Sequence, residues 1–231
     1  MRDNSKNTIS NQSDINPDLE KIVKRHLSSD YAKPYRQGSE EIFEQLSRRV
    51  AKHRGQLIFD SGCGTGESVI AIAGQFPQAL VIGVDKSNLR TDKARQKVLP
   101  ENAMLIRADV IDIWRLAALA NWRLARHFIL YPNPWPKKQQ FKRRWHGHPV
   151  FPTLLGLGGK IHLRSNWKIY LEEFAAAAKI AGKADVKIKV ATFQSITPIS
   201  AFEKKYSDSG HVLFQYELNL CDDPVVSSVS H

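Results

Sequence analysis

The chain has 231 residues, of which 42% are hydrophobic and 25% are charged, and its net charge is +11. This composition is typical of a globular domain, and no apolar run approaches the roughly 18 residues that a membrane span needs. Two cysteines cannot build a disulfide framework, and no His or Cys set has metal-ligand spacing, so we expect no metal site. The excess of Lys and Arg suggests a polyanionic partner.

The two ends of the chain differ from its middle in composition. Residues 1–29 are polar and carry no apolar stretch of the signal-peptide kind, so we expect a disordered N-terminal arm on a cytoplasmic protein. Residues 30–220 should form one domain, and residues 221–231 a flexible tail. The sequence leaves the oligomeric state open, with a monomer favoured.

Hydrophobic periodicity predicts helices and strands that alternate along the chain. Expected helices cover 39–54, 67–76, 88–99, 111–122 and 167–183, and expected strands cover 56–60, 79–85, 103–110, 125–132 and 160–165. This alternation predicts an α/β fold with a mostly parallel, doubly wound sheet and helices on both faces. Two further strand-like runs, 186–193 and 211–218, should form an antiparallel hairpin at the C-terminal edge of the sheet.

A glycine-rich turn joins the first predicted strand to the next helix. Residues 60–66 read D-S-G-C-G-T-G, and glycine lets the backbone of such a turn approach a ligand closely. The next two strands also end in acids, Asp85 and Asp109. Because the carboxyl ends of parallel strands meet at one edge of the sheet, the carboxylates should share one ligand site. Asp85 would there accept the ribose hydroxyl protons of a nucleoside cofactor.

The glycine spacing separates two cofactor classes. Dinucleotide enzymes need G-x-G-x-x-G, but Glu67 occupies the third glycine position, and the chain instead has G-x-G-x-G headed by an acid. An acid there suits a cofactor with a cationic amino acid end and no phosphate; the alternative is glycines that serve only a tight turn. The turn resembles that of the class I S-adenosylmethionine methyltransferases. This resemblance implies a single Rossmann-like domain and S-adenosylmethionine as cofactor, with these binding residues: Asp60, Gly62, Gly64, Gly66, Asp85, Lys86, Asp109 and Val110.

A proline-rich basic segment follows the fourth predicted strand. Residues 131–145 read YPNPWPKKQQFKRRW, and the cations that could meet phosphates are Lys137, Lys138, Lys142, Arg143 and Arg144. Trp135, Phe141 and Trp145 are interleaved with them, and aromatic side chains stack on bases. A charge run is usually a solvated face. This one follows a strand that ends at the predicted cofactor edge, which favours a nucleic acid partner.

The basic segment is similar to P-D-P-W-P-K-K-R-H-x-K-R-R, the signature of the tRNA (guanine-N7)-methyltransferase family. Downstream, residues 165–170 resemble the family's T-D-W-x-x-Y, and residues 198–206, PISAFEKKY, resemble its P-x-T-K-F-E-x-x-Y. The resemblance runs from about residue 30 to 218 and implies a tRNA substrate. The chain departs from the pattern because Asn133 and Asn166 replace two aspartates and Gln139-Gln140 replaces an Arg-His pair. Ser200 replaces the family's threonine before F-E, offset by one residue from Phe202.

The resemblance also implies residue roles. Its catalytic positions correspond to Asn133, Asn166, Arg143 and Glu203, and its RNA-binding positions to Lys137, Lys138, Lys142, Arg143, Arg144, Trp135, Ser200 and Tyr206. Guanine N7 has a lone pair and no proton, so its methylation needs no general base and depends on alignment with the S–CH3 bond. A carboxylate could stabilise the guanine cation that forms, whereas an asparagine offers one carbonyl. The departures leave open another RNA base or a small ligand as acceptor, and a catalytically weak RNA-binding paralogue.

Overall fold

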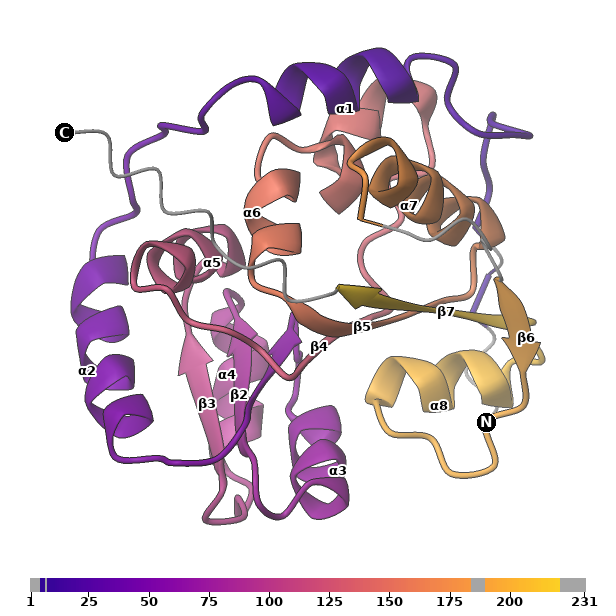
Figure 1. The fold of residues 1–231 in the computed structure, drawn as a ribbon. Coiled ribbons are helices and arrows are strands. Elements are labelled where there is room, and N and C mark those ends of the chain that lie inside the picture. The colour runs from indigo at the N-terminus through magenta and orange to yellow at the C-terminus, as the bar shows by residue number, and fades with distance from the viewer. Residues whose placement is uncertain (1–4, 7, 184–189, 221–231) are drawn as a thin grey trace, which may run out of the picture.

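The computed structural model describes residues 5–6, 8–183 and 190–220. Its centre is a sheet of seven strands in the order β3-β2-β1-β4-β5-β7-β6 (Figure 1). The strands are β1 (Leu57–Ser61), β2 (Leu80–Asp85), β3 (Ala103–Arg107), β4 (Arg126–Leu130), β5 (Gly159–Ser165), β6 (Ala191–Phe193) and β7 (Leu213–Leu220). Strands β1 to β5 pair in parallel, and β7 pairs antiparallel with both β5 and β6. The predicted α/β fold with an antiparallel edge is therefore confirmed; residues 186–189 of the first expected edge strand lie outside the described residues.

Helices cover both faces of this sheet (Figure 1). They are α1 (Leu19–Leu27), α2 (Ser39–Ala51), α3 (Glu67–Gln75), α4 (Asn88–Arg95), α5 (Val110–Leu119), α6 (Phe151–Gly156), α7 (Lys168–Ile180) and α8 (Ala201–Asp208). Two 3-10 turns, η1 (Lys138–Arg143) and η2 (Trp145–Gly147), follow β4. The basic segment, residues 131–145, thus contains all of η1 and the first residue of η2.

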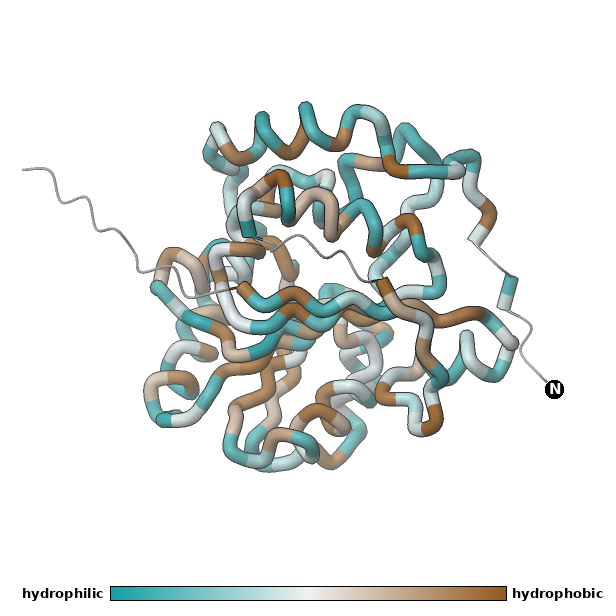
Figure 2. The backbone as a smooth tube through the Cα atoms, turned by 45° about the vertical axis from the view of Figure 1, so that its right-hand side comes forward, coloured by the Kyte–Doolittle hydropathy of each residue, from teal (hydrophilic) through white to brown (hydrophobic). Residues whose placement is uncertain are grey.

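Two hydrophobic cores hold the layers together. The larger core packs α1, α2, α5, α6 and α7 on one face of the sheet and contains Trp114, Phe151 and Phe174, each fully buried. The smaller core packs α3 on the other face. Strand β2 is buried at every position, as expected for a parallel strand covered on both faces. Figure 2 shows the hydrophobic residues concentrated along the sheet strands and on the helix sides that face them.

The N-terminal region differs from the expected disordered arm over residues 1–29. Leu19–Leu27 forms α1, which lies beside α7 and α6 (Figure 1). Leu19 and Val23 are 4% and 1% exposed in the larger core, and polar residues occupy the outer side of the helix. A polar composition hid this amphipathic helix, because its apolar positions are few and lie a turn apart. The tail predicted over 221–231 lies outside the described residues.

Two sequence-based exclusions concern membrane spans and metal sites. Among the described residues, no helix is both long and apolar enough to cross a membrane. Within the same part of the chain, no group of three or more His, Cys, Asp or Glu side chains converges as metal ligands would.

Candidate active site

The glycine turn between β1 and α3 lies at the carboxyl end of the parallel strands. Gly62, Gly64 and Gly66 have φ values of 84°, 59° and 82°, a region that residues with a Cβ rarely adopt. In this conformation the backbone N–H of Gly64 donates a hydrogen bond of 3.0 Å to the Asp85 carboxylate. The turn thereby joins the end of β1 to the end of β2.

Asp85 is a wall of a cavity at this edge. Its carboxylate also accepts from the backbone N–H of Ser87 at 2.8 Å, and the Arg90 guanidinium lies 3.2 Å away. The residue is 2% exposed, and it lines the cavity together with Gly62 and Lys86. Donors on several sides therefore fix the carboxylate at the cavity surface.

Asp109 lines the same cavity from the end of β3. It is the N-cap of α5, where its side chain accepts from the backbone N–H of Ile111 at 2.9 Å. Its other oxygen lies 2.9 Å from Nε of Arg36, a residue of the segment before α2. Val110, predicted with Asp109, is also part of the cavity wall.

Asp60 lies beneath the site and does not line the cavity. It is 1% exposed, and the Ser68 hydroxyl donates to its carboxylate. Burial raises the pKa of Asp60 to about 7 against the lowering effect of Ser68, and the nearby charge of Asp85 raises it further. Of the turn glycines, Gly64 lines a second, smaller cavity that shares Gly62 with the main one, and Gly66 lines neither.

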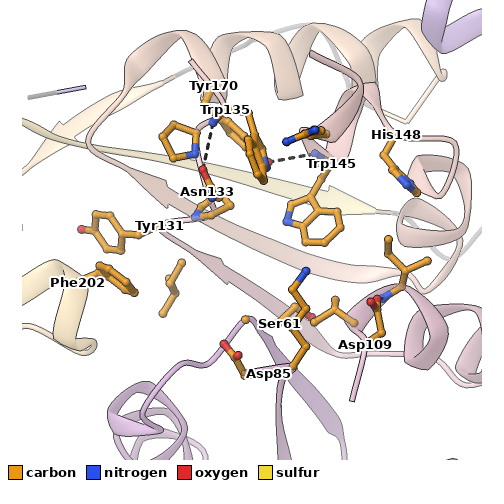
Figure 3. Close-up of a pocket in the computed structure, with 18 of the residues that line it drawn as sticks. Ser61, Asp85, Asp109, Tyr131, Asn133, Trp135, Trp145, His148, Tyr170 and Phe202 are labelled. Atoms are coloured by element: carbon orange, nitrogen blue, oxygen red, sulfur yellow. Dashed lines mark hydrogen bonds between the residues drawn. The ribbon is translucent and has the colours of Figure 1, made fainter. Parts of the chain in front are cut away.

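The main cavity has a volume of about 790 Å³, within the range of small-molecule sites (Figure 3). Figure 3 shows Asp85, Ser61 and Asp109 on one side and Asn133, Trp135 and Tyr131 on the other. The cavity gathers residues predicted from three separate regions, namely the cofactor edge, the basic segment and residues 198–206: Gly62, Asp85, Lys86, Asp109, Val110, Asn133, Trp135, Lys142, Arg143 and Tyr206. It therefore joins the cofactor edge to the basic segment.

The turn after β4 forms the wall opposite Asp85. Tyr131 and Trp135 have φ values of 50° and 46°, a left-handed conformation that costs of order 1–3 kcal/mol for a residue with a side chain. Between them, Asn133 Oδ1 accepts from the backbone N–H of Trp135 at 3.3 Å. The guanidinium of Arg143 lies 4.7 Å from the Trp135 ring centre. Backbone strain of this kind concentrates at functional sites.

Asn166 and Glu203, expected at the acceptor site, line neither cavity. Nδ2 of Asn166 lies 3.0 Å from Nδ1 of His211. Glu203 is 1% exposed and accepts from Arg164 at 2.8 Å and from the Tyr131 hydroxyl at 3.3 Å. Glu203 thus lies behind Tyr131, a residue of the cavity wall.

Helix α8 contributes a further wall. Ser200 is its N-cap, with Oγ accepting from the backbone N–H of Glu203 at 3.1 Å, and Ser200 lines the smaller cavity. Tyr206 and Phe202 line the main cavity with stacked rings whose centres are 6.1 Å apart. Aromatic faces at this position could contact a base.

The basic segment separates into exposed and buried cations. Lys137, Lys138, Lys142 and Arg143 are exposed. Arg144 is 0% exposed, and its guanidinium lies 2.5 Å from the carboxylate of Glu173, which is also fully buried. The prediction that Arg144 contacts RNA phosphates is therefore wrong, because the side chain presents no surface to a partner.

Several cavity residues were missed by the sequence analysis as site residues. They are Arg36, Ser61, Arg90, Ile111, Leu130, Tyr131, Pro132, Pro134, Trp145, His148, Tyr170 and Phe202. The basic and downstream motifs already contained Tyr131, Trp145 and Tyr170. Arg36 had no such signal: Asp112 on α5 places it by accepting from its backbone N–H at 2.9 Å.

The cofactor side of the cavity fits S-adenosylmethionine. A Cβ built on Gly62 would meet nothing within 4 Å, so the backbone there borders open space. Asp85 offers acceptors for ribose hydroxyls at that wall, and Asp109 and Val110 border the same space. A dinucleotide is disfavoured because Glu67 occupies the position of the third glycine in its G-x-G-x-x-G pattern.

Comparisons with known proteins bear on the family of the chain. A family model described as "Putative methyltransferase" matches residues 54–216. A protein named tRNA (guanine-N(7)-)-methyltransferase from Mycobacterium avium is 29% identical over 182 residues, which cover 71% of this chain and 66% of that protein. A protein of the same name from Thiobacillus denitrificans is 29% identical over 67% of this chain and 70% of its own length. Both carry the name of the family that the sequence resembles.

Solved structures show the same fold. An antibiotic-related methyltransferase superposes with a TM-score of 0.55 at 14% identity, over 76% of this chain and 92% of that chain. The 16S rRNA (adenine(1408)-N(1))-methyltransferase from Catenulisporales acidiphilia, solved with its cosubstrate SAM, gives 0.52 at 14% identity, over 79% and 92%. The family match covers most of the chain, and the predicted enzyme class and cofactor, S-adenosylmethionine, are confirmed with it. The chain therefore belongs to the methyltransferase family whose model matches residues 54–216.

Proposed function

We propose that the protein transfers the methyl group of S-adenosylmethionine to N7 of a guanine in tRNA. The observation that carries this proposal is one cavity that joins the acidic cofactor edge to the Asn133–Trp135 turn, with exposed cations next to it. The relatives named tRNA (guanine-N(7)-)-methyltransferase support the substrate. A cytoplasmic tRNA is also a polyanion that suits a net charge of +11.

S-adenosylmethionine, when bound, supplies an electrophilic methyl group. Asp85 and Asp109 would hold its nucleoside part, and the turn around Gly62 would border the rest. Guanine N7 has no proton to lose, so the acceptor side need only hold the base in line and balance the charge that develops on it. Trp135, Phe202 and Tyr206 offer ring faces for the base, while Lys137, Lys138, Lys142 and Arg143 would contact phosphates.

One polar residue of the acceptor side would contact the base directly, and two others would act through a neighbouring residue. Asn133 borders the cavity and would contact the base directly, with one lone pair of Oδ1 already directed at the Trp135 N–H. Glu203 would act by holding Tyr131. Asn166 would act by holding His211, whose ring centre lies 5.1 Å from that of Tyr206. We therefore regard Glu203 and Asn166 as positioning residues.

The experiment that tests the function is nucleoside mass spectrometry of tRNA incubated with the protein and isotope-labelled S-adenosylmethionine. Labelled 7-methylguanosine is the expected product. A different labelled nucleoside would replace the proposed acceptor with another base. Retained tRNA binding without transfer of label would instead identify an RNA-binding paralogue.

The same assay measures the effect of the Asp-to-Asn departures. Asn133→Asp adds a negative charge where guanine becomes cationic. A charged hydrogen bond of about 1.5–3 kcal/mol, realised only in the transition state, would raise the rate roughly 10- to 150-fold. Asn166→Asp is the matched comparison and should have a smaller effect, because its side chain faces His211. Equal effects of the two substitutions would contradict the direct and indirect roles assigned to them.

A further inference from the structure

The N-terminal residues before α1 run along the acceptor side of the molecule. We call residues 5–16, of which residue 7 lies outside the described set, the N-terminal strap. Figure 1 shows the chain passing from α8 to the side of the molecule that holds α1 and α7. At one end, the carbonyl of Ser5 lies 2.8 Å from Nε2 of His211. At the other end, the backbone N–H of Asn16 donates to Glu173 at 2.9 Å.

The middle of the strap is bonded to the basic segment. The Ser10 hydroxyl donates to the carbonyl of Pro136 at 2.7 Å, and the backbone N–H of Lys138 donates to Asn11 Oδ1 at 3.3 Å. Gln12 accepts from Nη2 of Arg144 at 3.0 Å through its amide oxygen. The strap is therefore attached to the segment that carries Asn133 and Trp135.

A buried carboxylate on α7 accepts hydrogen bonds from both the strap and the basic segment. Glu173 is 0% exposed and accepts from four donors: Arg144 Nη1 at 2.5 Å, His146 Nε2 at 2.9 Å, Gln12 Nε2 at 2.5 Å and the Asn16 N–H at 2.9 Å. Burial alone would raise the pKa of Glu173, but the hydrogen bonds and charges of His146 and Arg144 outweigh it, so its pKa is lowered. An ionised buried carboxylate requires such a complete set of donors.

Arg144 extends this network to the cavity wall. Its Nε and Nη2 both donate to the carbonyl oxygen of Trp135, at 3.2 and 2.9 Å. The guanidinium lies 4.6 Å from the ring centre of Trp167 and 5.5 Å from that of Phe141. A planar guanidinium can hold the carbonyl with two N–H groups and Glu173 with a third, which a lysine ammonium cannot do in this geometry.

We propose that Arg144 and Glu173, completed by Gln12 of the strap, are positioning residues that set the Asn133–Trp135 turn against the cofactor edge. The two bonds to the Trp135 carbonyl stabilise the left-handed conformation of that residue. The backbone N–H of Trp135 in turn donates to Asn133 Oδ1, and the Arg143 guanidinium lies over the Trp135 ring. Arg144 thus positions Asn133 and Arg143, which border the cavity, through its bonds to the backbone of Trp135.

This inference rests on the proposed function for its catalytic consequence but not for its structural one. We therefore choose Arg144→Lys, which keeps the charge and loses the planar guanidinium, and Gln12→Ala, which removes one side chain of the strap from the network. Ser13→Ala, at an exposed neighbouring position of the strap, is the matched control. All variants are made in the full chain.

The first measurement needs no RNA. In ¹H–¹⁵N spectra, the indole N–H resonance of Trp135, assigned with Trp135→Phe, should shift in Arg144→Lys and less in Gln12→Ala, and stay in place in Ser13→Ala. An unshifted Trp135 resonance in Arg144→Lys would overturn the proposal. That outcome is independent of which base the enzyme methylates.

The second measurement compares transfer with binding. Single-turnover methyl transfer should slow about 10- to 100-fold in Arg144→Lys, since a displacement of about 1 Å can cost 10²-fold. Gln12→Ala should slow it severalfold. The salt dependence of tRNA binding should stay at the wild-type slope in Arg144→Gln, because a buried side chain contacts no phosphate. A reduced salt slope, or a shifted resonance with an unchanged transfer rate, would overturn the positioning role.

Discussion

The two sides of the cavity are held in place in different ways. On the cofactor side, Asp85 and Asp109 are fixed by backbone donors close in sequence, namely Ser87 and Ile111, each two residues away. On the acceptor side, the turn at Trp135 is fixed by Arg144, whose partners Glu173 and Gln12 lie 29 and 132 residues away. Asp85 and Asp109 also have more distant partners, Gly64 and Arg36, but each carboxylate has a donor within its own turn. The cofactor side thus depends in part on local turns, whereas the acceptor side depends on the assembled fold.

This difference shows where each half of the site is vulnerable. A local turn forms its hydrogen bonds between residues that are already close in the chain. Its glycines permit the backbone conformation that these bonds require. A buried ion pair is stable only when all its hydrogen-bond partners are present. Removing one partner leaves an uncompensated buried charge. Changes on the acceptor side should therefore affect the fold, whereas changes on the cofactor side should affect ligand binding.

The largest effect should follow Glu173→Ala. Removing this carboxylate leaves the Arg144 charge buried without its ion-pair partner. Breaking a buried pair of this kind lowers the free energy of unfolding by about 3–5 kcal/mol. Denaturant unfolding should show a loss of that size. Glu172→Ala is the control: Glu172 forms a partly exposed i,i+4 pair with Lys168 and should cost no more than about 1 kcal/mol. Similar losses in both variants would show that the buried pair stabilises the fold no more than the exposed one.

A smaller effect, on binding, should follow Asp85→Ala. Losing a charged hydrogen bond to the ribose should weaken S-adenosylhomocysteine binding by about 1.5–3 kcal/mol, measured by calorimetry. Affinity for tRNA should stay near the wild-type value, because the other wall of the cavity is intact. Glu44→Ala, on the exposed side of α2, is the control. Unchanged cofactor affinity in Asp85→Ala would show that Asp85 is not a ribose ligand.

A pH effect of similar size should come from Asp60. Its pKa is about 7 in the folded protein and near the ordinary 3.8 when unfolded, so the folded state binds the extra proton between these values. Stability should therefore fall as pH rises through this window, by about 2 kcal/mol between pH 5 and pH 7, and level off above it. Asp60→Asn should lack this component in unfolding measurements at each pH. Parallel curves for both proteins would mean that Asp60 is ionised throughout.

The smallest effect should follow neutralisation of exposed cations. Lys137→Gln with Lys138→Gln should lower the slope of log affinity for tRNA against log salt by about 0.7–0.9 per lost phosphate contact, while cofactor binding stays constant. Arg48→Gln with Lys52→Gln, at the end of α2, is the control pair. If both double variants change the slope equally, the basic segment is a solvated face like any other.

The fold class and most of the cofactor side could be predicted from the order of residues in the chain. The order of strands and helices follows from periodicity, and Asp85 and Asp109 could be placed because parallel strands end at one edge of the sheet. Gly62, Gly64 and Gly66 adopt the positive φ values for which only glycine is well suited. These features depend on residues close together in the chain, so a reading of the chain in order finds them. The burial of Asp60 behind the turn, away from the cavity, was not found in this way.

Which residues of the acceptor side face the cavity could not be predicted from the chain and depends on the assembled fold. Arg143 and Arg144 are adjacent and chemically alike, yet one lies over the Trp135 ring in the cavity and the other is fully buried. The fold brings Arg144, and not Arg143, to the buried carboxylate of Glu173 on α7, and a buried carboxylate requires a cationic partner. The polar residues before α1 are ordered for the same reason, since Gln12 and Asn16 donate to that carboxylate. Long-range pairing of buried charge leaves no periodic pattern along the chain, so it becomes visible only when the fold brings the partners together.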